Sequence, residues 1–278
     1  MTGPDGMAPP VPPLLPGELP LAILVDYDGT IALTDVSDTV MAEHVVRAGA
    51  WETEVAAYDA GHLGSRALME LEMGLIDVPG EHLLATAAAQ PHDPEFVPFA
   101  RRAQAAGIPV EIVSDGFGFF IEPALERLGL AELPVVTART TFGGRRASIA
   151  FPNGHPTCFV CGTCKRNRVL AHQAAGRAVV FIGDGESDRY AAGYSDVVWA
   201  KRSLVQICLE AGWPFHRWTS FREIDQWLLD VVVAWHADPG SLPGPRAHRI
   251  FCGPEVWGAG MVDPPAGSWP PVQAESHP

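Results

Sequence analysis

The chain lacks any apolar stretch of about 18 residues, the length that a membrane-spanning helix requires. It also lacks an N-terminal basic region followed by a hydrophobic segment, so no secretory signal peptide is visible. We therefore expect a cytoplasmic protein with no membrane partner. In that compartment the five cysteines of the chain should be mostly reduced.

Positive charge is scarce. The chain has 19 Lys and Arg residues against 33 Asp and Glu residues, which gives a net charge of −14, and no run of Lys and Arg exceeds two residues. Binding to nucleic acid requires clustered cations that contact phosphates, so a nucleic-acid partner is excluded. The sequence does not indicate an oligomeric state.

The two ends of the chain differ in composition from its middle. The chain has 278 residues, 47% of them hydrophobic, which is enough for one sizeable core plus an insertion. Residues 1–19 and residues 237–278 are rich in Pro and Gly, and we expect both segments to be flexible. The C-terminal tail contains Phe251, Trp257 and Trp269, and our preferred interpretation is that it docks back onto the parent domain, with another partner as the alternative.

The most informative stretch is Asp26-Tyr27-Asp28-Gly29-Thr30, which directly follows an apolar run at residues 21–25. This pattern predicts a buried strand that ends in a tight turn with two carboxylates. Mg²⁺ binds oxygen ligands and keeps room for waters and a substrate phosphate, so such a pair suits a magnesium site. A carboxylate can also attack phosphorus and form an aspartyl-phosphate.

Two further apolar runs end in the same way. Residues 110–113 are followed by Ser114-Asp115-Gly116, and residues 179–182 are followed by Gly183-Asp184-Gly185-Glu186-Ser187-Asp188. Lys165 lies between these two clusters. Ligand sites of open parallel sheets lie at the carboxyl ends of the strands, so we expect the three clusters that follow the apolar runs to meet at that end of the sheet.

The pattern of apolar runs predicts an α/β fold with a doubly wound parallel sheet. Strands are expected at 21–26, 108–114, 133–137, 179–183 and 196–199, and core helices at 95–106, 118–129, 165–175, 188–193, 203–211 and 220–235. Residues 36–94 are far longer than one crossover helix and read as four helices, at 37–48, 52–60, 65–73 and 80–89. We expect a core domain at 20–35 and 95–236 and a helical cap domain at 36–94.

These ordered clusters resemble the four motifs of the haloacid dehalogenase (HAD) superfamily, and the resemblance covers roughly residues 20–236. It implies a Rossmann-like core and a Mg²⁺-dependent phosphatase with a cap similar to that of phosphoserine-phosphatase-like members. By the match of motifs, Asp26 is the nucleophile and Asp28 the general acid and base. Phosphatases of this superfamily carry this second Asp, whereas its dehalogenases and phosphonatases lack it, so the resemblance favours phosphate-ester chemistry.

The remaining motif residues match the phosphate and metal ligands of the superfamily. Ser114 and the amide of Gly116 match the phosphate-binding groups, and Lys165 matches the cation that neutralises the nucleophile and the phosphoryl group. Asp184 matches a ligand of Mg²⁺ beside Asp26 and the backbone carbonyl of Asp28. Asp188 would orient a metal-bound water or Lys165.

A cysteine-rich segment precedes Lys165. His155, Cys158, Cys161 and Cys164 recur every third residue, and three cysteines with one histidine are a known zinc set. The spacing does not match paired zinc knuckles, and the fourth cysteine of a ferredoxin run is missing. Our preferred interpretation is reduced cysteines that shape the loop, with a structural zinc as the alternative.

The substrate is expected to be a small phosphorylated metabolite. Asp35, Arg66 and Asp115 are the candidates for substrate specificity. Gly64-Ser65-Arg66 and the Cys-Gly-x-Cys-Lys segment resemble the methionine-salvage phosphatases, which act on 2-hydroxy-3-keto-5-methylthiopentenyl-1-phosphate. Asp115 resembles the phosphocholine and phosphoethanolamine phosphatases, and the spacing of Asp35 resembles that of phosphoserine phosphatases. A phosphoryl transferase or mutase and a non-catalytic interaction module are the remote alternatives.

Overall fold

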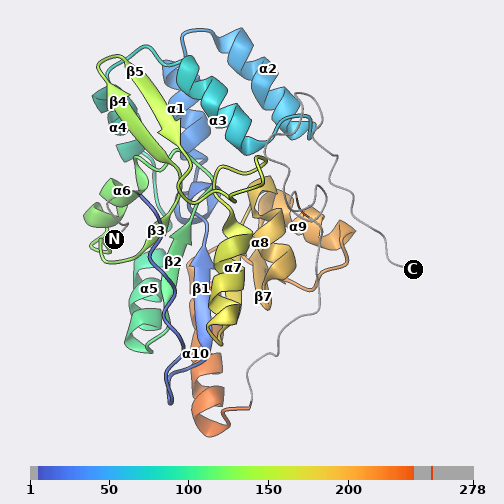
Figure 1. Cartoon of the computed structure of the whole chain (residues 1–278). Coiled ribbons are helices and arrows are strands. Elements are labelled where there is room, and N and C mark those ends of the chain that lie inside the picture. The colour runs from blue at the N-terminus through green and yellow to red at the C-terminus, as the bar shows by residue number, and fades with distance from the viewer. Residues whose placement is uncertain (1–5, 241–251, 253–278) are drawn as a thin grey trace.

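The computed structural model describes residues 6–240 and residue 252. Its centre is a six-stranded parallel sheet with the strand order β3-β2-β1-β6-β7-β8 (Figure 1). The strands are β1 (Leu21–Val25), β2 (Val110–Val113), β3 (Val135–Val136), β6 (Ala178–Gly183), β7 (Val197–Ala200) and β8 (His216–Arg217). The predicted parallel sheet is therefore confirmed, with β8 as a short edge strand that the sequence did not predict.

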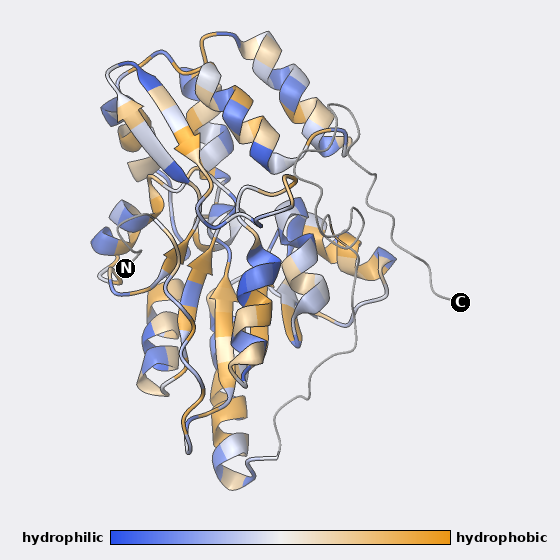
Figure 2. Cartoon of the chain, in the orientation of Figure 1, coloured by the Kyte–Doolittle hydropathy of each residue, from blue (hydrophilic) through white to orange (hydrophobic). Residues whose placement is uncertain are grey.

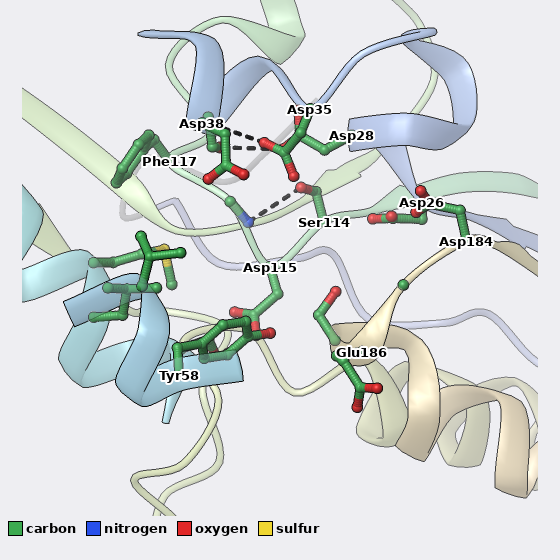
Figure 3. A pocket seen from close by; sticks show the side chains of 18 of the residues that line it. Asp26, Asp28, Asp35, Asp38, Tyr58, Ser114, Asp115, Phe117, Asp184 and Glu186 are labelled. Atoms are coloured by element: carbon green, nitrogen blue, oxygen red, sulfur yellow. Dashed lines mark hydrogen bonds between the residues drawn. The ribbon is translucent and has the colours of Figure 1, made fainter. Parts of the chain in front are cut away.

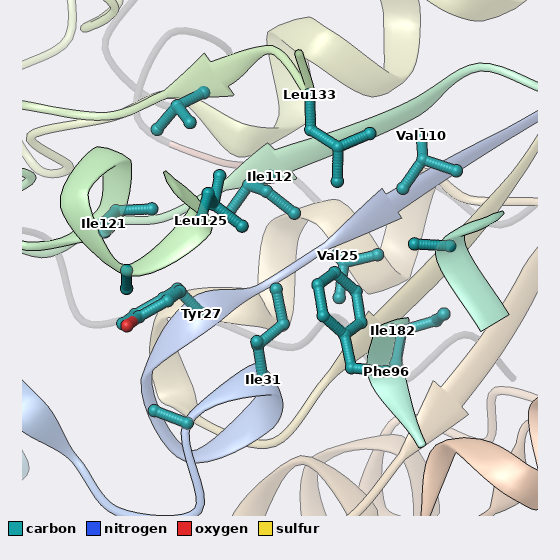
Figure 4. Packing of buried hydrophobic residues seen from close by; sticks show 14 of the residues in the cluster. Val25, Tyr27, Ile31, Phe96, Val110, Ile112, Ile121, Leu125, Leu133 and Ile182 are labelled. Atoms are coloured by element: carbon teal, nitrogen blue, oxygen red, sulfur yellow. The ribbon is translucent and has the colours of Figure 1, made fainter. Parts of the chain in front are cut away.

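The central strand β1 is buried on both faces. Leu21, Ile23 and Val25 belong to one hydrophobic cluster and Leu24 belongs to a second. Because successive side chains of a strand point to opposite faces, the two clusters are the two faces of the sheet. Figure 4 shows Val25, Ile112 and Ile182 of three neighbouring strands in the first cluster. Figure 2 shows the strands of the parallel sheet as largely hydrophobic.

Helices cover both faces, which makes the sheet doubly wound. The first cluster includes side chains of α5 (Phe96–Ala105), α6 (Ile121–Arg127) and α10 (Phe221–Ala237). The second includes side chains of α7 (Lys165–Ala174), α8 (Arg189–Tyr194) and α9 (Arg202–Glu210). All six were predicted. Helix α6 begins three residues later than expected, and Gly118 before it has a φ of 79° and lies against the backbone of Ala138.

Four helices lie beyond the carboxyl ends of the strands, at the top of Figure 1. They are α1 (Val36–His44), α2 (Ala48–Asp59), α3 (Ser65–Gly74) and α4 (Gly80–Ala88). The insertion between the first two sheet strands is thus helical, as predicted. An antiparallel hairpin of β4 (Arg139–Gly143) and β5 (Arg146–Ala150) adds to it, a feature that the sequence analysis did not predict.

The hairpin is joined to the helices by specific contacts. Strand β5 packs against α3, and a Cβ on Gly80 at the start of α4 would lie 2.6 Å from the ring of Phe142. Arg145 at the turn forms an ion pair with Asp77, with 2.9 Å between Nε and Oδ1. The hairpin thereby extends the helical layer with a segment that follows the third strand of the sheet.

The N-terminal segment 6–19 lies against α7 and the loop before it. Arg168 donates to the carbonyl of Pro9 at 2.9 Å, Arg177 donates to that of Pro12 at 2.7 Å, and the amide of Leu14 donates to Ala175. Composition predicted flexibility here and did not indicate these contacts. Of the C-terminal tail, only residues 237–240 and Cys252 are described, so the expected docking of Phe251, Trp257 and Trp269 lies outside the described residues. None of the described helices is long and apolar enough to span a membrane.

Candidate active site

The first strand of the sheet delivers Asp26 and Asp28 to the site. The amide of Asp26 still donates to Ile182 of the neighbouring strand, and the chain then turns through η1 (Tyr27–Ile31). Gly29 adopts a φ of 63°, and a Cβ there would lie only 2.1 Å from Oδ2 of Asp184. Only glycine therefore fits this turn. The Asp28 carboxylate accepts hydrogen bonds from the amide of Val36 at 2.9 Å and from Oγ of Ser37 at 3.2 Å.

Lys165, the first residue of α7, connects the residues that follow strands β1 and β6. Its Nζ donates to Oδ1 of Asp26 at 2.7 Å, to Oδ1 of Asp188 at 2.6 Å and to Oγ of Ser187 at 3.1 Å. Only 3% of Lys165 is exposed. Burial lowers the pKa of its amine, but the carboxylates of Asp188 and Asp26 together raise this pKa by more than burial lowers it. The net shift is therefore upward, and the amine stays charged.

Three carboxylates form a compact acidic group. One ligand oxygen from each of Asp26, Asp184 and Asp188 lies within 4.8 Å of the other two. The second oxygen of Asp188 accepts from the amides of Asp184 and Gly185 at 2.8 and 3.1 Å. Asp188 is thus occupied by Lys165 and by backbone, which leaves Asp26 and Asp184 as the pair that can hold an ion.

The electrostatics of this group fit a divalent cation. Burial and then Asp188 raise the pKa of Asp184 to about 7, and the same two causes raise the pKa of Asp26 well above its usual range. Carboxyl groups with raised pKa values gain from a nearby positive charge. Carboxylate oxygens are the ligands that Mg²⁺ prefers, so the donor set fits this ion.

The second strand delivers Ser114 and Gly116. Oγ of Ser114 accepts from the amide of Gly116 at 3.2 Å. A Cβ on Gly116 would lie 2.8 Å from the Asp28 carboxylate and 3.3 Å from Oγ of Ser114. The absence of a side chain at Gly116 therefore leaves room for the polar groups of Asp28 and Ser114 close to its backbone. Figure 3 shows Ser114 between Asp28 and Asp115, with Asp26 and Asp184 beside it.

These residues line a cavity of about 350 Å³ between the sheet edge and the helical layer. Cavities of this size hold small metabolites. Core residues form one wall: Asp26, Asp28, Ser114, Asp115, Gly116, Asp184 and Ser187. The opposite wall comes from α1, α2 and α3: Asp38, Val55, Tyr58, Asp59, Ser65, Leu68, Met69 and Glu72.

The three specificity candidates occupy different positions. Asp35 lines the cavity, and its Oδ1 accepts from the amide of Asp38 at 2.8 Å, so it also caps α1. Asp115 lines the cavity and accepts from Oγ of Ser65 at 2.5 Å and from the amide of Thr163 at 2.7 Å. Arg66 does not line the cavity.

Arg66 points to the hairpin side of α3. Its guanidinium lies 4.8 Å from the ring centre of Phe151 and 5.2 Å from that of Phe159. The sequence could not reveal this, because the two rings lie about 85 and 93 residues further along the chain. We conclude that Arg66 packs against these rings, away from the residues around Asp26.

Sequence reasoning missed several polar residues of the cavity, among them Glu72 and Arg202. Glu72 is buried on α3 and accepts from Nε1 of Trp51 at 2.8 Å, and burial raises its pKa to about 8. Glu72 lies seven residues after Ser65 and so on the same face of the helix, and this spacing could have indicated that both residues face the cavity. Arg202 donates to Oδ2 of Asp184 at 3.1 Å from a backbone with a φ of 48°, which no sequence pattern indicated.

The cysteine-rich segment lies behind Lys165, apart from the main cavity. His155, Cys158, Cys161 and Cys164 line a second, much smaller cavity together with Cys252. None of these cysteines forms a disulfide within the described part of the chain. Cys252 was not part of the zinc set considered from the sequence.

Comparison with known proteins gives consistent results. The family model of haloacid dehalogenase-like hydrolases matches residues 23–193. A protein of Brevibacillus brevis named 2-hydroxy-3-keto-5-methylthiopentenyl-1-phosphate phosphatase is 27% identical over 223 residues, which cover 76% of this chain and 96% of that protein. A protein of the same name from Lysinibacillus sphaericus is 28% identical, with coverages of 78% and 97%.

Solved structures show the same fold. A phospho-aspartyl intermediate analogue of phosphoserine phosphatase matches with a TM-score of 0.59 at 17% identity, covering 76% of this chain and 99% of that one. A substrate-bound phosphoserine phosphatase complex matches with a TM-score of 0.57 at 16% identity, with coverages of 76% and 98%. At these identities the likeness concerns the fold alone.

Proposed function

The chain belongs to the haloacid dehalogenase-like hydrolase family, and on this premise we propose that it hydrolyses a small phosphomonoester through an aspartyl-phosphate on Asp26. The observation that carries the proposal is the contact of Lys165 with Asp26 and Asp188 beside Asp184, at the wall of a metabolite-sized cavity. Burying an amine and two carboxylates has a large desolvation cost, and buried charge groups of this kind cluster at functional sites.

In the first step, the Asp26 carboxylate attacks phosphorus, an O–P bond forms, and the ester P–O bond breaks. Asp28 gives its proton to the leaving oxygen. Burial and the nearby Asp35 carboxylate raise the pKa of Asp28 well above its usual range, which keeps a proton on this group. In the second step, water attacks phosphorus, its proton passes to Asp28, and the Asp26 carboxylate is released with inorganic phosphate.

The other residues stabilise charge during both steps. Lys165 offsets the charge of Asp26 and of the phosphoryl group, and Ser114 with the Gly116 amide binds a phosphate oxygen. Asp26, Asp184 and the backbone carbonyl of Asp28 would hold Mg²⁺. When bound, this ion supplies further neutralisation of the phosphate charge.

The names of the relatives suggest the substrate, and the cavity offers support. We propose 2-hydroxy-3-keto-5-methylthiopentenyl-1-phosphate, the compound in the names of both relatives. Val55, Leu68, Met69 and Phe117 give the cavity an apolar surface that suits a methylthio group. The acidic side chains of Asp35, Asp38, Asp59 and Glu72 favour, as a second candidate, a phosphorylated amine such as phosphocholine, phosphoethanolamine or phosphoserine. Both candidates fit a cytoplasmic enzyme.

The test is release of inorganic phosphate from a panel of phosphorylated metabolites, with and without Mg²⁺. We expect hydrolysis to require Mg²⁺ and to stop with EDTA, to be abolished in Asp26→Asn, and to be unchanged in the matched variant Asp230→Asn, since Asp230 is an exposed residue of α10 that does not line the cavity. The methylthio compound should have the highest kcat/KM. Turnover that persists in Asp26→Asn would contradict the nucleophile, and transfer to an acceptor without phosphate release would indicate a transferase or mutase instead.

A further inference from the structure

Four cysteines surround one small cavity behind Lys165. Cys158, Cys161 and Cys164 come from the loop that precedes α7, and Cys252 comes from about 90 residues further along the chain. Cys158 and Cys252 are buried, and the other two are partly buried. A loop and a distant cysteine have thus been brought to the same point.

The size of the cavity limits what it can hold. Its volume is about 20 Å³, and a site needs roughly 10–15 Å³ to admit one water-sized particle. There is room for a single ion and no room for a multi-iron cluster. The sulfur-rich lining selects for soft or borderline metals such as zinc over the hard ions Mg²⁺ and Ca²⁺.

We propose that Cys158, Cys161, Cys164 and Cys252 bind one structural zinc ion. Four thiolates are a common tetrahedral zinc set, and the two spacers of two residues in the loop fall within the usual range for zinc ligands. The fourth ligand that the local sequence lacks is supplied by Cys252. The site is separate from the carboxylates of Asp26 and Asp184 and does not depend on the phosphatase mechanism.

His155 lines the same cavity, but its hydrogen bonding argues against ligation. Its Nδ1 accepts from the amide of Thr157 at 3.1 Å. A neutral imidazole that binds metal through Nε2 carries its proton on Nδ1 and cannot accept this bond. Cys252 therefore replaces His155 as the fourth ligand.

Arg166 supports the charge of the proposed site. Its Nη1 donates to Sγ of Cys252 at 2.8 Å, and its guanidinium lies 4.8 Å from the ring centre of Tyr194. Zinc with four thiolates carries a net charge of −2, so a guanidinium held in place by an aromatic ring offsets part of it. Hydrogen bonds from neighbouring residues to metal ligands commonly tune the site in this way.

Binding requires the thiols to move inward. Among the described residues, the three carboxylates of the active site are the only group of three or more whose ligand atoms all lie within 4.8 Å of one another, so no three of the thiols are that close together. With Zn–S distances of about 2.3 Å, the sulfurs of a bound set are roughly 3.8 Å apart. All four cysteines lie outside helices and strands, so closing this gap requires a shift of irregular backbone together with the thiols.

The zinc ion would stabilise the loop that carries two residues of the active-site region. The same loop carries Thr163, whose amide binds Asp115, and ends at Lys165. A zinc ion would fix both residues and hold residue 252 against the core. The expected role of the zinc ion is therefore structural, so the first measurement is the metal content of the protein.

The experiment is metal analysis of the full chain, expressed with zinc and dialysed against EDTA and then Mg²⁺. We expect one zinc per chain in the wild type, and cobalt in its place should give an intense thiolate-to-metal charge-transfer band. Cys161→Ser and Cys252→Ser should bind zinc at least about tenfold more weakly in competition with a chelator. Asp184→Asn, His155→Gln and Cys208→Ser should keep it; Cys208 is a buried cysteine of α9 that does not line the cavity.

Three results would overturn the proposal. A wild-type protein that retains no zinc and gives no cobalt–thiolate band lacks the site, and this outcome is independent of whether any variant folds. Loss of zinc in Asp184→Asn but not in Cys161→Ser would place the ion at the carboxylates. Loss in His155→Gln with retention in Cys252→Ser would reject Cys252 as the fourth ligand.

Discussion

Replacing Asp115 by alanine should lower kcat/KM for all phosphate esters by a similar factor. The Asp115 carboxylate accepts from Ser65 of α3 at 2.5 Å and from the amide of Thr163 at 2.7 Å. The Ser65 bond joins the helical layer to the core, so its loss should disfavour the closed arrangement that completes the cavity. We expect an effect on closure that is independent of the group beyond the phosphate.

The magnitude follows from these bonds. A hydrogen bond to a charged group contributes about 1.5–3 kcal/mol, so loss of the Ser65 bond corresponds to roughly a tenfold to hundredfold fall in kcat/KM. Ser65→Ala should show nearly the same fall. Because both variants remove one shared contact, the double variant should be little worse than Asp115→Ala alone.

The assay is steady-state kinetics of the four proteins on an amine-bearing phosphate and on a neutral phosphate of similar size. Parallel losses on both substrates, with strong non-additivity between Asp115 and Ser65, are expected. Suppose instead that Asp115→Ala loses only the amine-bearing substrate while Ser65→Ala stays normal. Asp115 would then bind the substrate amine directly, and the closure argument would be refuted.

Three further changes have defined outcomes. Asp28→Asn should lower kcat by about 10²–10⁴-fold, with unchanged unfolding by urea, because it removes the proton donor. Burial raises the pKa of Glu72 from 4.5 to about 8, so the folded protein keeps a proton that the unfolded chain releases, and stability should fall between these pH values. In the wild type the free energy of unfolding by urea should decrease by at most about 5 kcal/mol from pH 5 to pH 9, and Glu72→Gln should remove this decrease. The same decrease in Glu72→Gln would contradict the claim that Glu72 is protonated in the folded protein. Glu111→Gln should destabilise the fold by about 3–5 kcal/mol in the same assay, because Arg168 at 2.6 Å and His172 at 3.2 Å lose a buried anionic partner.

The sequence was sufficient to predict that Asp26, Ser114 and Asp184 lie together. Each directly follows a continuous apolar run, and runs of this kind form parallel strands that are buried on both faces. The carboxyl ends of parallel strands share one edge of the sheet, so the order of motifs along the chain determines their meeting in space. Lys165 begins a helix and follows no strand, so its contacts with Asp26 and Asp188 were expected only from the resemblance to the family motif.

Other parts of the molecule could not be predicted in this way. The hairpin β4–β5 packs against α3 across about 80 residues, and Cys252 approaches Cys164 across a similar separation. Such contacts depend on packing between elements and leave no local periodic signal. The same reason explains Asp115: its neighbours in sequence suggested a substrate contact or a helix start, whereas its hydrogen-bond partner Ser65 lies 50 residues earlier.

The phosphorylated form of Asp26 tests the central claim most directly. The full chain is mixed with substrate and Mg²⁺, quenched in acid during turnover, and reduced with borohydride, which converts an aspartyl-phosphate to homoserine. We predict homoserine at position 26 in the peptide mass spectrum of the wild type, more of it in Asp28→Asn if hydrolysis of the intermediate is slowed, and none without substrate. Unmodified Asp26 during rapid phosphate release, or homoserine at a different aspartate, would contradict the proposed nucleophile.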